Sequence, residues 1–217
     1  MANEDRRFGL KPVRHKSGAP WNGAANPYFI KGDYATALFI GAPVVKTGTA
    51  NTAKVTVPGA GAFNIGTLPE INKTVVGDVD GNTKRITGAI VAFTPLPSDL
   101  SKNYNPASTE RVAWVCDDPD VVFEIQADGA IPATSIGLNA VLIATHSGST
   151  TTGLSGIELD TTSDAPAADA SNQLTIVRAV NREDNDTTTI WAKVEVLINA
   201  HTEAAGYTAA GDGTLGI

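Results

Sequence analysis

The stretch RVAWVCDDPDVVFEIQ, residues 111–126, places two apolar runs on either side of one acidic turn. Both runs are rich in β-branched and aromatic residues, which favour a pleated, half-buried surface. The segment DDPD, residues 117–120, favours a turn, because aspartate side chains bond nearby backbone groups and proline presets φ. The stretch therefore predicts either a β-hairpin or a strand, a corner and a second strand.

Other strand-like runs follow along the chain, separated by turn residues. The most regular is IWAKVEVLI, residues 190–198, in which successive side chains alternate between two faces. Helical periodicity is nearly absent, and short strands at intervals of about ten residues are typical of sandwiches and barrels. We therefore predict an all-β fold, a single β-sandwich or barrel of jelly-roll type. Its predicted core residues are Trp114, Val122, Phe123, Ile125, Ile176, Val194 and Val196.

The pattern predicts three regions. Residues 1–32 are interrupted by proline and glycine and carry isolated apolar side chains, which predicts an extended N-terminal arm. Such an arm needs another surface to bury these side chains, because alone it would barely offset its ordering entropy. Residues 33–200 form the predicted β body. Residues 201–217 form a glycine-rich C-terminal tail, predicted to be flexible or extended.

Composition and charge narrow the classes of partner. Of the 217 residues, 18% are charged and 42% are hydrophobic, which indicates a weakly charged surface suited to packing against other protein. The net charge of −7 argues against nucleic acid as the main partner. The first sixteen residues are nevertheless basic. They form either a solvated terminus or a basic arm that lies on an acidic protein surface. The basic residues are Arg6, Arg7, Lys11, Arg14 and Lys16.

One cysteine, Cys116, lies in an apolar run and is predicted to be a small buried hydrophobe. Its acidic neighbours disfavour the thiolate that a nucleophile needs. The start MANEDRRFG has no apolar stretch typical of a secretory signal, and no run approaches the length of a membrane span. We therefore expect a soluble protein made in the cytoplasm, without a membrane partner.

Motifs for catalysis and metal binding are weak. His15, His146 and His201 have no partner at ligand spacing, so no metal is expected. The acidic stretches 117–120 and 78–82 lack the closing glutamate of a calcium loop, and turn formation is the simpler explanation. No nucleophile elbow or phosphate-binding glycine loop occurs, so we expect no enzyme and no cofactor. Three tryptophans could line a sugar site, although such residues are more often core or interface anchors. They are Trp21, Trp114 and Trp191.

Several segments in order resemble the head decoration, or cement, proteins of tailed bacteriophages, which are encoded beside the major capsid protein. The resemblance extends over most of the chain, but residues 58–76 and the tail match no segment of these proteins. The family has no catalytic signature. The segments are RRFGLKPVRHKSGAPWNGAANPYFI (6–30), ATALFIGAPVVKTGTAN (35–51), RITGAIVAFTPLPSDLSKNYNPAS (85–108), VAWVCDDPDVVFEIQ (112–126), GLNAVLIATHSGSTTTGLSGIELD (137–160) and LTIVRAVNREDND (174–186).

The resemblance implies a β-rich virion protein on the outer surface of an icosahedral head, with the major capsid protein as its partner. Closed symmetry would make it a trimer or a dimer. Two alternatives remain: another virion part, such as a tail-tube, neck or fibre-base protein, and a carbohydrate-binding module or glycan-active enzyme. The basic arm is the predicted anchor on the capsid. Its predicted contact residues are Arg6, Arg7, Phe8, Leu10, Val13, Arg14, Lys16 and Trp21.

Overall fold

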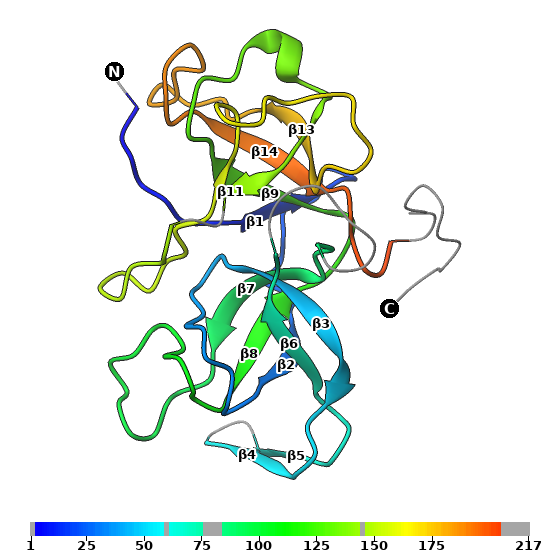
Figure 1. Ribbon diagram of the computed structural model, residues 1–217, viewed down its shortest axis with the longest axis vertical. Coiled ribbons are helices and arrows are strands. Elements are labelled where there is room, and N and C mark those ends of the chain that lie inside the picture. The colour runs from blue at the N-terminus through cyan, green and yellow to red at the C-terminus, as the bar shows by residue number, and fades with distance from the viewer. Residues whose placement is uncertain (1–2, 59–60, 76–83, 144–145, 205–217) are drawn as a thin grey trace.

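The computed structural model describes residues 3–58, 61–75, 84–143 and 146–204, and it is built almost entirely of β-strands (Figure 1). The prediction of an all-β protein is confirmed. The strands divide between a closed barrel and a separate five-stranded sheet, which follow one another along the long axis, so the jelly-roll arrangement is not confirmed. Within the described ranges, no helix is long and apolar enough to cross a membrane.

The barrel encloses one apolar core. One pair of its strands, β2 and β6, is parallel and the other pairs are antiparallel. Aliphatic side chains and Tyr28 fill its interior. A short hairpin of β4 (Val55–Val57) and β5 (Gly61–Phe63) covers a smaller apolar cluster at one end. The barrel strands, in spatial order, are β2 (Asn26–Ile30), β6 (Pro69–Lys73), β3 (Pro43–Ala50), β7 (Gly88–Phe93) and β8 (Arg111–Cys116).

The sheet carries the second and larger core on one of its faces. All of its neighbouring strands pair in the antiparallel sense. In order they are β1 (Lys11–His15), β9 (Val121–Gln126), β14 (Lys193–Ile198), β13 (Leu174–Ala179) and β10 (Asn139–Ala140). A ribbon of β11 (Leu142–Ile143) and β12 (Glu158–Leu159) and a 3-10 turn, η1 (Ala133–Ser135), accompany the sheet.

The acidic turn is a corner and not a hairpin. Strand β8 belongs to the barrel and β9 to the sheet, so the chain passes from the barrel to the sheet at this turn. Asp118 accepts a hydrogen bond from the amide of Asp120 (2.8 Å), as expected for an aspartate-stabilised turn. The Tyr28 hydroxyl donates to Asp117 (2.7 Å), and the Lys16 amide donates to the Asp120 carbonyl (2.7 Å). The corner is therefore hydrogen-bonded both to the barrel, through Tyr28, and to the end of sheet strand β1, through Lys16.

The prediction of a separate N-terminal arm over residues 1–32 is corrected by the strand pairing. Strand β1 is the edge strand of the sheet beside β9, and β2 is a barrel strand beside β8. Leu10, a predicted anchor, is fully buried in the core of the sheet. Of the isolated apolar side chains, Leu10 is therefore buried within the same chain, while Phe8, Val13 and Trp21 are half-buried, which neither their spacing nor the nearby prolines indicated.

Six of the seven predicted core residues are buried, and Trp114 is the exception. Side chains alternate along a strand, and the neighbours Ala113 and Val115 point into the barrel. Trp114 therefore lies half-buried on the outer wall. Val122 is buried, but on the face of β9 opposite to Phe123 and Ile125.

The predicted C-terminal tail begins inside the body. His201 is 1% exposed and forms a parallel bridge with Ile86. The predicted boundary at residue 201 is therefore too early. Residues 205–217, which hold the glycine-rich part of the predicted tail, lie outside the described residues, and so does the acidic stretch 78–82.

The long connection between β7 and β8 is held by the buried side chain of Arg111. Its guanidinium donates to three backbone carbonyls, those of Thr94 (2.6 Å), Tyr104 (2.7 Å) and Lys102 (3.1 Å). It also lies over the ring of Phe93, 5.2 Å from the ring centroid. Burial lowers the pKa of Arg111, but an arginine stays charged at any ordinary pH. The Arg111 guanidinium therefore satisfies backbone carbonyls that would bond to backbone amides in a strand or a helix.

Candidate interaction site

The face of the sheet opposite to its core is charged. Glu124 of β9 and Glu195 of β14 lie directly across from each other, a like-charge arrangement that destabilises a sheet when it is not neutralised. Arginines neutralise both carboxylates. Arg182 pairs with Glu124 (2.7 Å), while Arg14 (2.7 Å) and Arg178 (2.8 Å) pair with Glu195. The charged positions of the alternating 190–198 run are therefore part of the folded structure rather than a solvated face.

The protonation of Glu195 follows from these contacts. Burial raises the pKa of its carboxyl group, but the hydrogen bonds and charges of Arg178 and Arg14 outweigh that effect and leave the pKa below its ordinary value. A depressed pKa stabilises the fold above the ordinary glutamate pKa. That stability is lost as the pH falls from the ordinary pKa through the lower folded one.

We expect Glu195→Gln to lower the free energy of unfolding by about 2 kcal/mol at neutral pH, because two arginines lose their counter-charge. In urea titrations over the acidic range, the variant should lack the part of the pH dependence described above. The control is Glu4→Gln, because the Glu4 side chain is 67% exposed and its ion pair with Arg6 should contribute under about 1 kcal/mol. Equal losses for the two variants would contradict a structural role for Glu195.

Two buried polar side chains fasten the N-terminal segment to the sheet. Gln126 is fully buried, accepts a hydrogen bond from the Arg6 amide (2.9 Å) and donates to Asp5 (3.0 Å) and Glu158 (3.1 Å). Glu158 is 1% exposed and pairs with the Arg7 guanidinium (2.9 Å). Burial raises the pKa of Glu158, and Arg7 and Gln126 oppose that rise only in part. Residues 5–7 are therefore held by specific side-chain contacts.

After residues 5–7, residues 8–10 of the N-terminal segment cross over the backbone at Gly41. The two backbones are so close that no side chain fits between them. Gly9 (φ +70°) and Gly41 (φ +83°) both adopt left-handed conformations, and a Cβ on Gly41 would overlap the Phe8 carbonyl oxygen. The Leu10 amide donates to the Gly41 carbonyl (2.8 Å), and the Gly41 amide donates to the Ile90 carbonyl (2.7 Å). The two glycines therefore join the N-terminal segment to the barrel.

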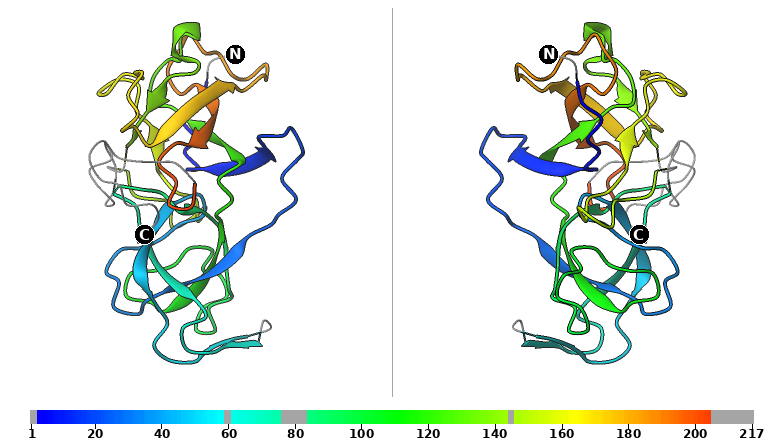
Figure 2. Two further views of the ribbon diagram at one scale, coloured as in Figure 1. Left: turned by 90° about the vertical axis from the view of Figure 1, so that its right-hand side faces the viewer. Right: turned by 90° about the vertical axis from the view of Figure 1, so that its left-hand side faces the viewer.

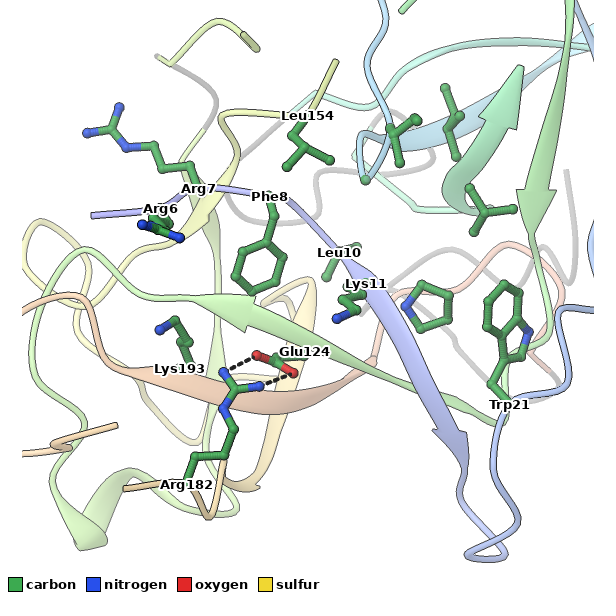
Figure 3. Close-up of a pocket in the computed structure, with 15 residues that line it drawn as sticks. Arg6, Arg7, Phe8, Leu10, Lys11, Trp21, Glu124, Leu154, Arg182 and Lys193 are labelled. Atoms are coloured by element: carbon green, nitrogen blue, oxygen red, sulfur yellow. Dashed lines mark hydrogen bonds and ion pairs between the residues drawn. The ribbon is translucent and has the colours of Figure 1, made fainter. Parts of the chain in front are cut away.

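A groove lies where the sheet, the barrel and the N-terminal segment meet, and we call it the junction groove (Figure 3). Its volume is about 570 Å³. Phe8 and Leu154 lie toward one end and Trp21 toward the other. Its main apolar lining residues are Phe8, Leu10, Trp21, Ile40, Ile90 and Leu154, and its charged ones are Arg6, Arg7, Lys11, Glu124, Arg182 and Lys193.

Most of these charges have partners within the chain. Arg182 is bonded to Glu124, and Lys193 lies 3.8 Å from Asp184. In the part of the chain that the structure describes, Lys11 has no ion-pair partner. Its ammonium group is therefore the charge in the groove that is available to a carboxylate from outside.

The predicted contact residues divide into two sets. Arg6, Arg7, Phe8, Leu10 and Trp21 line the junction groove, although Leu10 is fully buried. The remaining three do not line it. Val13 and Lys16 lie beyond it, and Arg14 is bonded to Glu195.

The sequence did not indicate any of the groove residues that come from distant strands and turns, and three of those residues are charged. They are Glu124, Arg182 and Lys193. Nothing in their local sequence relates them to residues 6–21, because only the pairing of β1 with β9 and of β9 with β14 brings them together.

The cysteine is buried, and two of the histidines lie beside carboxylates. Cys116 is 1% exposed, as predicted, and burial raises the pKa of its thiol to about 12. His15 lies 3.4 Å from Asp118, and His146 lies 3.5 Å from Glu158, two contacts that the sequence positions did not indicate. Among the described residues, no three metal-ligating side chains gather in one place.

Comparisons with protein-family models, with curated proteins and with solved structures find no match for this chain.

Proposed function

We propose that this chain is a structural component of a tailed-bacteriophage particle, which binds the outside of the icosahedral head and stabilises it. Its partners are the major capsid protein and further copies of itself, and it acts without a catalytic centre, a metal or a cofactor. The resemblance to decoration proteins supports this proposal. The observation that carries it is the form of the connection between β1 and β2.

This connection projects beside both bodies as a loop (Figure 2). Residues 16–20 and 22–24 are exposed, yet the loop is hydrogen-bonded at its base. The His15 amide donates to the Ala19 carbonyl (2.7 Å), and the Trp21 indole donates to the Ala24 carbonyl (3.2 Å). An ordered loop that projects from its own protein is suited to contact a second surface, because little ordering cost remains to be met on binding. Lys16 lies in its exposed part.

The test uses point variants, because removal of residues 2–20 would also remove β1 and the buried Leu10 from the body. We expect the double variant Arg6→Glu, Lys16→Glu to associate roughly tenfold more slowly with phage heads assembled without this protein, because peripheral charges steer docking. The matched control is Lys54→Glu, an exposed lysine near the barrel hairpin. Association rates are measured on immobilised heads at low and moderate salt.

An unchanged rate for the double variant would place the contact on another surface. Location of the chain in the tail tube or neck by cryo-EM would replace the head proposal with the alternative virion role. The tryptophans do not converge as they would in a sugar-binding cleft. Trp21 lines the junction groove, whereas Trp114 lies on the barrel wall and Trp191 precedes β14.

A further inference from the structure

The connection between β7 and β8, residues 94–110, displays an exposed apolar side chain. Leu100 is 79% exposed, more than any other large hydrophobic side chain among the described residues. Its backbone is held in a turn, because Asp99 accepts hydrogen bonds from the amide (3.0 Å) and the hydroxyl (2.6 Å) of Ser101. Because this turn is already ordered, a partner could bury the Leu100 side chain at little cost in conformational entropy.

The end of this turn and the residues that follow it are also held. Arg111 bonds the carbonyls of Lys102 and Tyr104, and the Tyr104 ring stacks on Phe39 with centroids 5.2 Å apart. A surface that is ordered before binding loses little conformational entropy when it binds. Leu100 and its turn can therefore act as a preformed knob, and we call residues 98–102 the Leu100 knob.

The chain itself contains a matching receptor. The junction groove has an apolar lining that suits a leucine, and Lys11 on its rim has no ion-pair partner within the described residues. Asp99 carries the complementary charge, since its bonds to Ser101 hold its pKa below the ordinary value. Lys102 lies 3.7 Å from Asp99 and leaves that carboxylate exposed to a second cation. We propose that the Leu100 knob of one copy docks into the junction groove of a second copy, with Asp99 facing Lys11.

The position of the knob relative to the groove suggests the symmetry of the contact. Asn103, just after the knob, donates to the Thr152 carbonyl (2.9 Å), and Leu154 two residues later lines the groove. The segment after the knob is thus bonded to the segment that carries Leu154, so the knob and the groove lie near each other in one copy. Two copies can therefore exchange knobs around a twofold axis, which gives a closed dimer with two equal contacts.

This contact between copies rests on the proposed function in one respect only, because the head surface is where the copies would meet. One buried leucine at each contact is too little for a tight complex in dilute solution. On a head surface, where neighbouring copies are already held close together, the same contact gains from a high effective concentration.

The experiment detects the contact covalently in solution. One sample carries Leu100→Cys and a second, of different tagged mass, carries Leu154→Cys. The native Cys116 is buried and does not compete. Under mild oxidation, we expect the mixed dimer to form roughly threefold faster than the dimer of Ile65→Cys with Leu154→Cys, because the Asp99–Lys11 pair still brings the knob to the groove after Leu100 is replaced. Ile65 is the matched control, since it is 67% exposed.

Two further arms complete the test. Lys11→Glu in the Leu154→Cys partner should slow cross-linking, whereas Lys54→Glu should not. A mixed-dimer rate equal to that of the Ile65 control overturns the proposal, as does faster pairing of Leu100→Cys with itself. Failure here with normal charge-dependent head binding leaves the proposed function intact. If cross-linking occurs but the charge variants bind heads at the normal rate, the contact between copies is supported and the N-terminal segment is not the part that binds the head.

Discussion

Gly41→Ala should lower the free energy of unfolding by about 3 kcal/mol, and this is one of the two largest effects that we expect. A side chain at φ +83° costs roughly 1–2 kcal/mol, and overlap with a neighbouring backbone atom adds a similar amount. The overlapped atom is the Phe8 carbonyl oxygen, which cannot move without loosening the N-terminal segment. Urea denaturation followed by tryptophan fluorescence measures the change.

The matched control is Gly18→Ala. Gly18 has a similar conformation (φ +95°), but no atom lies within 4 Å of its ideal Cβ. We expect a loss of only about 1 kcal/mol, due to the backbone conformation alone. Equal losses for the two variants would mean that the crossing of residues 8–10 over Gly41 is not closely packed, and the junction groove would then lack a rigid wall.

Arg111→Met should be comparably destabilising, by about 3 kcal/mol. The methionine keeps much of the buried apolar stem but removes the donors to the carbonyls of Thr94, Lys102 and Tyr104. Carbonyls left buried without a donor cost about 1–3 kcal/mol each, and those that regain water cost less. We also expect rapid proteolysis between β7 and β8, because the connection loses its anchor. Urea denaturation and limited proteolysis report the two effects separately.

Arg178→Met is the control for Arg111→Met. The Arg178 side chain is 58% exposed, and its partner Glu195 keeps the ion pair with Arg14. A loss below about 1 kcal/mol is expected, as for other exposed ion pairs. If Arg111→Met were no more destabilising than this control, the ordered state of the connection would have another cause, and the Leu100 knob would need a different explanation.

Local sequence was sufficient to recognise the strands with the clearest apolar pattern. The alternating run at residues 190–198 contains β14, with Val194 and Val196 in the core as predicted. The apolar runs of residues 111–126 are β8 and β9, and the acidic turn lies between them as expected. These predictions hold because side-chain direction along a strand and the turn preference of aspartate and proline depend on neighbouring residues only.

The N-terminal segment shows where local reasoning fails. Its prolines, glycines and scattered apolar side chains are typical of an extended arm, and it was predicted as one. Strand β1 exists because β9 pairs with it, and Leu10 is buried because the sheet core accepts it. Trp114 was placed in the core for its chemistry, but the register of β8 turns it to the outer wall.

The sequence by itself determined the all-β class, the burial of Cys116, the alternating strands and the place of the acidic turn. Only the tertiary structure decided that β8 and β9 belong to different bodies, that the arm supplies strands to both, and that Lys11 and Leu154 share a groove. The physical reason is that a strand satisfies its backbone hydrogen bonds with other segments of the chain. The choice among those segments is a property of the whole fold, and the junction groove exists only after that choice has been made.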